Sequence, residues 1–182
     1  AMTITLRFDG LYRPLNTGTG KIRTTAGLMC YGWVILRDGI VIGRGHGGYV
    51  RSNNASSHIA EYLGLIEGLE ALADMGLSNE AVVIIGDARS VIDQMRGEAS
   101  VSAERIRGFY QRAKRCAARF RAITWQWSPR KTNHDADALT RRALRQIRAN
   151  PESYTEILNQ KHPRFTPILD LRVFQASGLS LA

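Results

Sequence analysis

The chain has 182 residues, of which 44% are hydrophobic, and this length suits one domain or one domain with a short appendage. Its formal net charge is +9 and its isoelectric point is about 10.1, so its surface should attract polyanions, with nucleic acid as the leading partner. No segment approaches the ~20 apolar residues of a membrane span, no signal-peptide pattern opens the chain, and neither cysteine stands in a disulfide or zinc pattern, so we expect a cytoplasmic protein without membrane contact.

Three strands are expected in the first third of the chain. Alternating apolar residues predict a strand over Thr3–Asp9, and the polar segment Leu11–Gly27 then indicates a long loop. Two apolar runs, Cys30–Leu36 and Ile40–Gly45, flank an Asp-Gly pair, which is a strong hairpin signal. The three strands should therefore form an antiparallel meander.

The middle of the chain alternates between helical and strand patterns. Apolar residues at helical spacing predict a helix over His58–Met75, with Ser56 or Ser57 as its N-cap. The apolar run Ala81–Ile85 fits a buried parallel strand. We expect three further helices and a fifth strand, namely helices at Ala88–Met95, Glu104–Phe120 and Asp135–Ala149 and a strand at Ala122–Trp127. This order predicts an α/β domain, with helices packed on a sheet of five strands.

The last segment of the chain is too apolar for a solvated tail. Its apolar side chains are Tyr154, Ile157, Leu158, Phe165, Ile168, Leu169, Val173 and Phe174. We therefore predict a main domain over residues 2–149 and an ordered extension over residues 150–182. The extension would pack on its own domain or on a second copy of the chain, and both arrangements remain open.

Four acidic residues stand at separated places in this pattern. Asp9 and Asp87 end predicted strands, where ligands bind in open α/β sheets, while Glu61 and Asp137 lie in the first turns of predicted helices. A single acid of this kind is more often a helix cap or a solvated side chain. A cluster of carboxylates, in contrast, supplies the anionic oxygens that hard divalent ions need, and two such ions commonly serve phosphodiester cleavage.

The motifs around these acids are a strand followed by Asp-Gly, then CYGWVILRDG, AEYLGLIEGLEAL, VVIIGD and N–x–x–ADAL. Together they resemble type 1 ribonuclease H, in particular the prokaryotic ribonuclease H-like domains, over about Met2 to Ile147. The resemblance implies a ribonuclease H-like fold, with a mixed five-stranded sheet in which only the second strand is antiparallel. Residues 2–149 would then be the catalytic domain.

The resemblance also implies an activity, which is hydrolysis of the RNA strand of RNA–DNA hybrids by a two-metal mechanism. The products would carry 5′-phosphate and 3′-hydroxyl ends, and the cofactor would be two Mg²⁺ ions, with Mn²⁺ as the alternative. His134 lies in the loop where some members carry a histidine that shuttles protons or helps product release, although its spacing to Asp137 is shorter here, and a polar role at the helix entry is the alternative. Asp135 is the rival of Asp137 for the fourth ligand. The implied metal-binding carboxylates are Asp9, Glu61, Asp87 and Asp137.

Two residues before Glu61 depart from the family pattern. Many members have Asn-Asn there, which approaches the hybrid backbone and helps to sense the RNA 2′-hydroxyl, whereas this chain has Ser57-His58. We expect Ser57 and His58 to contact nucleic acid in that place, with a polar role in the cap region as the alternative for His58. How strictly the RNA strand is recognised stays open.

A basic helix is the second feature that suggests nucleic-acid binding. Seven basic residues between Arg105 and Arg121 have no acid among them, and the family uses a basic region in about this place to hold the DNA strand. An ordinary solvated face is the alternative, but like charges on so short a stretch favour a polyanion partner. The predicted contacts are Arg112, Lys114, Arg115 and Arg119.

Two other functions fit the same fold. A nucleic-acid-binding module with weak or altered catalysis is the first, although the presence of all four acids argues against it. A 3′–5′ exonuclease is the second, but that class needs an Asp-x-Glu pair on the first strand, which Asp9-Gly10-Leu11 lacks.

Overall fold

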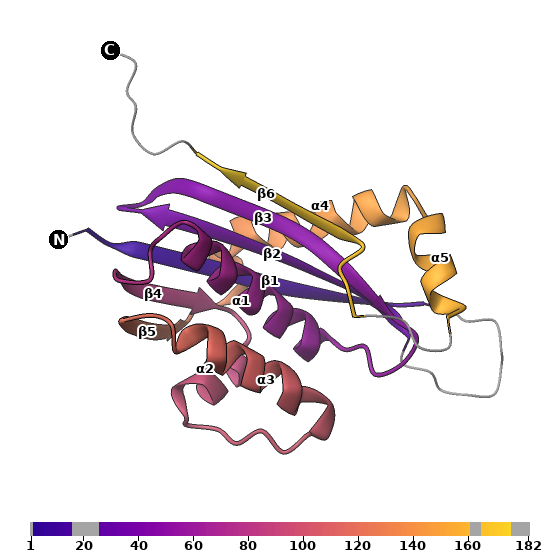
Figure 1. The fold of residues 1–182 in the computed structure, drawn as a ribbon, viewed down its shortest axis with the longest axis horizontal. Helices are drawn as coiled ribbons and strands as arrows, with labels where there is room; N and C mark the ends of the chain where they lie inside the picture. Colours follow the sequence, from indigo (N-terminus) through magenta and orange to yellow (C-terminus); the bar gives the residue numbers. More distant parts are fainter. Residues whose placement is uncertain (1, 16–25, 161–164, 176–182) are drawn as a thin grey trace, which may run out of the picture.

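The computed structural model describes residues 2–15, 26–160 and 165–175, and one mixed sheet forms their centre (Figure 1). Its strands are β1 (Ile4–Pro14), β2 (Gly27–Arg37), β3 (Ile40–Arg51), β4 (Ala81–Gly86), β5 (Ala122–Trp127) and β6 (Leu169–Phe174). Across the sheet their order is β5-β4-β1-β2-β3-β6. The predicted α/β class and ribonuclease H-like topology are therefore confirmed.

The strand directions follow the expectation for the first five strands. β4 pairs parallel with both β1 and β5, while β2 pairs antiparallel with both β1 and β3. The expected number of strands was wrong by one, because β6 adds antiparallel to the free edge of β3, with His46 opposite Leu171. An unpaired edge of backbone groups favours such an addition. The division at residues 149 and 150 and self-association through the extension stay predictions.

The first three strands are longer than their apolar patterns predicted. β1 and β2 remain paired beyond Asp9, from Leu11 opposite Cys30 to Pro14 opposite Gly27, so part of the predicted loop is strand. The pairing continues one residue to one without a bulge from Ile4 opposite Arg37 to Pro14 opposite Gly27, because the ladder is made by backbone groups. Residues 16–25 of the predicted loop lie outside the described part of the chain.

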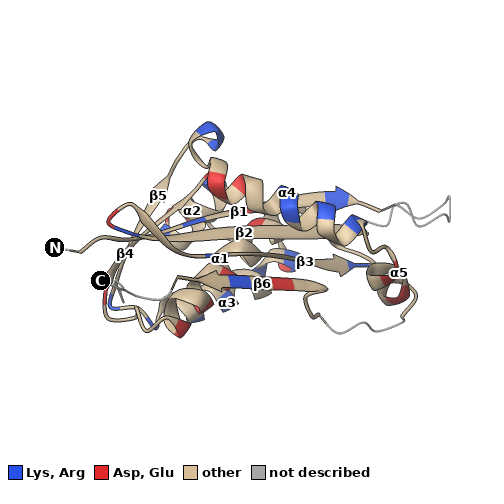
Figure 2. Cartoon of the chain, turned by 90° about the horizontal axis from the view of Figure 1, so that it is seen from above, with Lys and Arg blue, Asp and Glu red and all other residues tan. Residues whose placement is uncertain are grey.

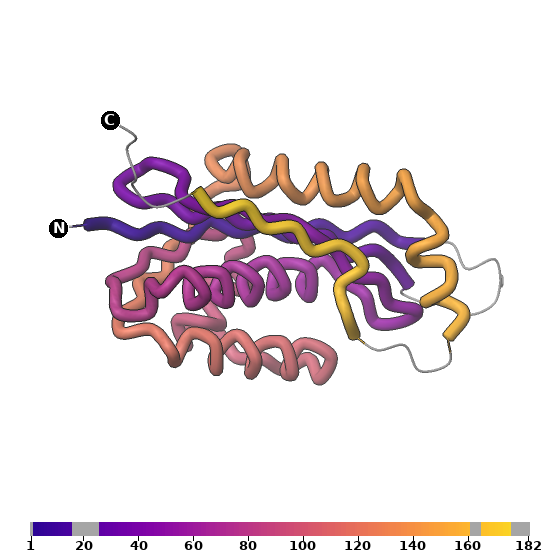
Figure 3. The backbone as a smooth tube through the Cα atoms, turned by 45° about the horizontal axis from the view of Figure 1, so that its top comes forward, coloured from indigo at the N-terminus to yellow at the C-terminus, as the bar shows by residue number. Residues whose placement is uncertain are grey.

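Helices cover both faces of the sheet. Figure 2 shows α4 (His134–Arg148) on one face and α1 (Ser57–Asp74) and α3 (Glu104–Ala117) on the other, and the tube in Figure 3 shows the same separation. The helices α2 (Arg89–Arg96) and α5 (Glu152–Leu158) and the 3₁₀ turn η1 (Arg130–Thr132) complete the described elements. None of the helices in the described ranges combines the length and hydrophobicity that crossing a bilayer requires.

The faces of the sheet bury two apolar cores of different size. The larger core lies under α1 and α3 and includes Phe8, Trp33 and Leu63, which are fully buried. The smaller core lies under α4 and includes Cys30 and Ile147. Both faces of the central strands are therefore anchored, and the ends of β1 and β4 are held in fixed positions.

Candidate active site

Three of the four acids meet where β4 ends beside β1. Because β1 and β4 are parallel neighbours, with Phe8 opposite Gly86, the next residues Asp9 and Asp87 come side by side. Glu61 reaches them from the second turn of α1, and one carboxylate oxygen from each of the three residues lies within 4.8 Å of the others. The α/β topology thus gathers acids that are far apart in the sequence.

Two glycines allow α1 to approach β1 closely enough for this meeting. A Cβ on Gly10 would lie 2.2 Å from both the Ala60 carbonyl carbon and the Glu61 amide nitrogen. A Cβ on Gly64 would lie 2.5 Å from the Asp9 carbonyl oxygen. Ser56 fixes the start of the helix, because its hydroxyl accepts a hydrogen bond from the Ile59 amide at 3.1 Å. The helix is therefore held against the strand at the point where the acids converge.

The three acids are costly to ionise together. Burial, followed by the charge of Asp87, raises the pKa of Asp9 to about 7. Burial and then the charges of Asp9 and Asp87 raise the pKa of Glu61 well above its usual range, and burial raises the pKa of Asp87. The Glu61 Oε2 atom is buried without a hydrogen-bond partner among the described residues. A divalent cation would offset the negative charge of the three carboxylates and would give the Glu61 Oε2 atom a partner, so these residues fit a hard metal ion.

Asp137 lines the same cavity, which has a volume of about 280 Å³, but it is not one of the three acids whose oxygens lie within 4.8 Å of one another. Partial burial alone would raise its pKa, but the hydrogen bond from Arg141 at 2.9 Å and the nearby Arg130 lower it. Asp135 is exposed and lines a different cavity. Of the two candidates for the fourth ligand, Asp137 is the one beside the other acids.

Asn133 is a buried site residue whose importance sequence reasoning missed. Its Nδ2 atom donates hydrogen bonds to the Phe8 carbonyl oxygen at 2.9 Å and to Asp87 Oδ2 at 3.4 Å. It therefore ties the strand that carries Asp9 to the carboxylate of Asp87 and to the start of α4. The asparagine of the N–x–x–ADAL motif was the only available signal, and the spacing alone did not indicate where its side chain points.

The neighbouring residue His134 is exposed and is not among the residues that line the acid cavity. It occupies the first position of α4, whereas Asp137, one turn later, lines the cavity. Participation of His134 in catalysis therefore stays a prediction.

The two predicted nucleic-acid contacts at the start of α1 point in different directions. Ser57 is exposed and lines the acid cavity. His58 is half-buried; its ring stacks on Tyr62 with centroids 5.5 Å apart, and its Nε2 atom lies 3.1 Å from Gln94 Oε1. Adjacent helical residues differ by about 100° in direction, which explains the divergence. Contact between nucleic acid and either residue stays a prediction.

The basic residues of α3 lie on the α1 side of the sheet and differ in their surroundings. Lys114 and Arg115 are exposed, and Arg112 is half-buried. Arg119 follows the helix and forms an ion pair with Glu70 at 3.1 Å. Lys114 and Arg115 are therefore the most available of the predicted contacts for a polyanion.

Comparison with known proteins gives a consistent family. Residues 19–143 match the family model described as reverse transcriptase-like. The bifunctional protein Rv2228c of Mycobacterium tuberculosis is 36% identical over 90 residues, which are 50% of this chain and 24% of that protein. Ribonuclease HI of Halobacterium salinarum is 32% identical over 126 residues, which are 69% of this chain and 61% of that protein. The matched part is thus less than two thirds of the length of either relative.

Solved structures agree with this result. The N-terminal RNase H domain of Rv2228c superimposes with a TM-score of 0.68 at 26% identity, covering 83% of this chain and 99% of that one. RNase H1 of Halobacterium salinarum superimposes with a TM-score of 0.64 at 30% identity, covering 79% of this chain and 98% of that one. LC11-RNase H1, which was solved in complex with an RNA/DNA hybrid, superimposes with a TM-score of 0.64 at 21% identity, covering 80% of this chain and 99% of that one. It shares the fold of this chain.

The resemblance inferred from the motifs is therefore confirmed by a family model that spans more than half of the chain and by structural neighbours of the same kind. This chain belongs to the reverse transcriptase-like family and, within it, to the type 1 ribonuclease H domains.

Proposed function

We propose that this protein is a metal-dependent endonuclease that hydrolyses the RNA strand of RNA–DNA hybrids. The convergence of Asp9, Glu61 and Asp87 within 4.8 Å carries the proposal, because such a cluster suits phosphodiester hydrolysis. Membership of the type 1 ribonuclease H family and the similarity to a ribonuclease HI support the substrate class.

The acid cavity offers a place for each part of this chemistry. Asp9, Glu61, Asp87 and Asp137 would hold two Mg²⁺ ions, with Mn²⁺ as the alternative. Bound there, the ions would supply an activated water and charge stabilisation at the leaving 3′-oxygen, giving 5′-phosphate and 3′-hydroxyl ends. Arg141 and, less strongly, Arg130 lower the pKa of Asp137 and so favour its ionised form.

One cleavage assay tests the proposal. End-labelled RNA–DNA hybrid, duplex RNA, duplex DNA and single strands are incubated with Mg²⁺, with Mn²⁺ and with a chelator. We expect cleavage of the RNA strand of the hybrid only, and only with a divalent ion. Ligation of the products would require the predicted 5′-phosphate end. Cleavage in chelator, or equal cleavage of duplex DNA, would contradict the proposal.

The orientation of His58 favours a second candidate, a nucleic-acid-binding module with weak or altered catalysis. Its imidazole is engaged with Gln94 and Tyr62, so it does not replace an asparagine at the cavity. The same assay separates the two candidates, since the module would bind the hybrid tightly in Mg²⁺ without turnover.

Hybrid binding should weaken steeply with salt, partly because of α3. Replacing the exposed Lys114 and Arg115 with Ala should lower the affinity and reduce the slope of log K against log salt by about 1 to 2, since fewer counterions are released. Arg107→Ala is the matched control on the same helix, because Arg107 is already paired with Glu104 at 2.9 Å and should contribute less. Fluorescence anisotropy at four salt concentrations measures the slopes. Equal slopes for the wild type and the double variant would show that α3 faces away from the substrate.

A further inference from the structure

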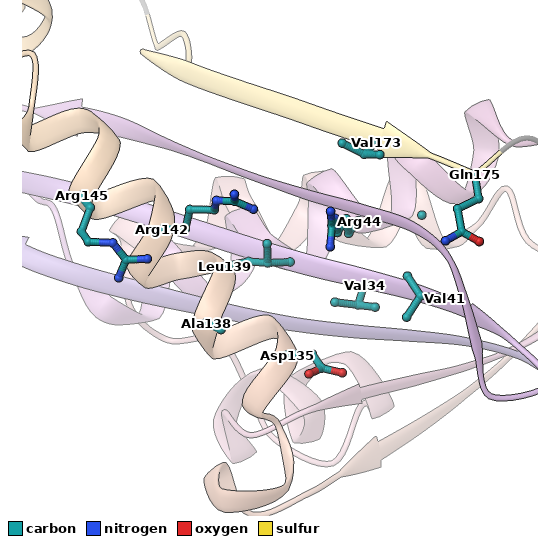
Figure 4. A pocket seen from close by; sticks show the side chains of 11 residues that line it. Val34, Val41, Arg44, Asp135, Ala138, Leu139, Arg142, Arg145, Val173 and Gln175 are labelled. Carbon is teal, nitrogen blue, oxygen red and sulfur yellow. The ribbon is translucent and has the colours of Figure 1, made fainter.

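A second cavity lies on the other flank of α4 from the acids. It has a volume of about 600 Å³ and opens between α4 and the sheet (Figure 4). Val34 of β2, Val41 of β3 and Leu139 of α4 give it an apolar floor. Figure 4 shows Arg142 reaching from α4 toward Arg44 on β3, so two guanidinium groups face the cavity from opposite walls.

A smaller hollow of about 290 Å³ continues this cavity along β6. The two share Arg44, Arg142 and Val173 in their lining, so they form one groove, which we call the α4–β6 groove. His46 is 7% exposed in the lining of the smaller hollow, and its Nε2 atom lies 2.7 Å from Gln146 Oε1. This contact joins β3 to α4, so the two walls of the groove are held at a fixed separation.

Three arginines of the groove lack a counterion among the described residues, whereas a fourth, Arg172 in the smaller hollow, is paired with Asp74 and Glu67. Arg44, Arg142 and Arg145 line the larger cavity, and none of them forms an ion pair with a described carboxylate. Asp135 is the one acidic residue in the lining of this cavity within the described ranges. Arg141 on the opposite flank differs, because it is paired with Asp137 at 2.9 Å. Clustered guanidinium groups without counterions favour a ligand with phosphate oxygens.

The rest of the lining suits a ligand that also has an apolar face. Val173 and Leu171 of β6 are 53% and 44% exposed beside the arginines, and they extend the apolar floor. A flat base can pack on such aliphatic side chains, while Asp135 can accept a hydrogen bond from an amino or ribose hydroxyl group. The volume of the larger cavity, about 600 Å³, lies in the range of small-molecule sites.

We propose that the α4–β6 groove is a nucleotide-binding site, separate from the acid cavity, with phosphate on Arg44, Arg142 and Arg145 and the base on the aliphatic floor. The ligand is a free nucleotide or one nucleotide unit of a strand, since both present the same groups. The site does not depend on the proposed hydrolysis, because Arg141 faces the acids whereas Arg142, about 100° further around α4, faces the groove.

Titration with adenosine 5′-monophosphate in chelator tests this site in the absence of hydrolysis, because the metal ions are removed. The metal-free acids also repel anions, so the acid cavity should not compete for the nucleotide. We expect saturable binding by calorimetry, weakened by about 10-fold or more in Arg142→Ala/Arg145→Ala. Ala138→Glu, which adds an acid to the lining and removes no arginine, should weaken it similarly. Arg148→Ala is the control on the same helix outside the lining, and it should bind as the wild type does.

A second arm identifies the source of the nucleotide. A labelled single-stranded hexanucleotide is titrated in the Lys114→Ala/Arg115→Ala background, which lowers the competing positive charge of α3. The groove variants are Arg142→Ala/Arg145→Ala and Ala138→Glu. If the protein binds the hexanucleotide but not the mononucleotide, and the groove variants lose this binding, the ligand is a unit of a strand. If the protein binds the mononucleotide, and the groove variants lose this binding, the ligand is a free nucleotide. Absence of binding by both probes, or binding unchanged in both groove variants, overturns the proposal. Equal affinity for inorganic phosphate and the mononucleotide overturns the role of the apolar floor.

Discussion

Replacing Asp9 with Asn should abolish hybrid cleavage and, at the same time, stabilise the metal-free protein. The variant keeps the shape and the Oδ1 atom that accepts a hydrogen bond from the Gly10 amide at 2.9 Å, but it loses the charge shared with Glu61 and Asp87. We expect turnover to fall by about 10³-fold or more, because a metal ligand is lost. The melting temperature without metal should rise at pH 8, where the wild type must keep a buried carboxylate ionised.

The pH dependence of this stability difference follows from the pKa of Asp9, which is raised from 3.8 to about 7. A raised pKa stabilises the folded state fully below the unfolded value, and this contribution is lost as the pH rises through the folded value. The advantage of Asp9→Asn should therefore be small near pH 4 and grow until about pH 7. Above that pH we expect a difference on the order of 1–3 kcal/mol in the free energy of unfolding.

Thermal melts with and without Mg²⁺, from pH 4 to pH 8, check the predicted stabilisation by Asp9→Asn and its pH dependence. Mg²⁺ should raise the melting temperature of the wild type and much less that of Asp9→Asn. Asp93→Asn is the matched control, since Asp93 lies on α2 and pairs with Arg96 at 3.8 Å. It should retain activity and the response to Mg²⁺. Full turnover in Asp9→Asn, or a metal-free melting temperature below that of the wild type at pH 8, would contradict this account of the site.

Gly10→Ala should cost both stability and activity, although it adds a single methyl group. That group would meet backbone atoms of Ala60 and Glu61 at 2.2 Å, and backbone cannot move aside as a flexible side chain can. The helix α1 must shift away from β1, which we expect to cost about 3 kcal/mol or more. Because the shift separates Glu61 from Asp9, turnover should also fall in the fraction of molecules that is folded.

Gly108→Ala is the control for this substitution. Gly108 lies within α3, and a Cβ there would meet nothing within 4 Å, so Ala should raise stability by about 0.5–1 kcal/mol through its higher helix propensity. Urea unfolding of both variants, with activity measured at a temperature where circular dichroism shows the folded state, separates the two effects. An unfolding free energy of Gly10→Ala equal to that of the wild type would show that the contact between β1 and α1 is not tight.

The sequence predicted the arrangement of the acids better than their surroundings. Asp87 follows the end of β4 and Asp9 lies beside it within the longer strand β1, and the apolar patterns of β1 and β4 were strong enough to predict two neighbouring strands there. The choice between Asp135 and Asp137 depended on which flank of α4 faces the sheet edge, and packing against β1 and β2 decides that. The engagement of His58 with Gln94 joins residues from two different helices, so it could not be deduced from local patterns.

The sixth strand escaped prediction for a related reason. The segment LDLRVF is short and alternating, but its partner β3 contains a glycine-rich stretch that carries little strand signal. One of those glycines, Gly45, leaves room for a neighbouring side chain, since a Cβ there would lie 2.2 Å from the Trp33 ring. The pairing of two strands more than a hundred residues apart is set by tertiary structure, and the apolar pattern of a short segment does not indicate its partner.

The pairing of β6 with β3 has a consequence for folding during synthesis. All other strands of the described sheet precede β6 in the chain, so they can assemble while residues 169–174 are still inside the ribosome. During that interval the edge of β3, from Gly43 to Gly48, presents unpaired amide and carbonyl groups that can template pairing with another nascent chain. By pairing with this edge, β6 protects the chain against aggregation, but only after residues 169–174 have been synthesised and can reach β3.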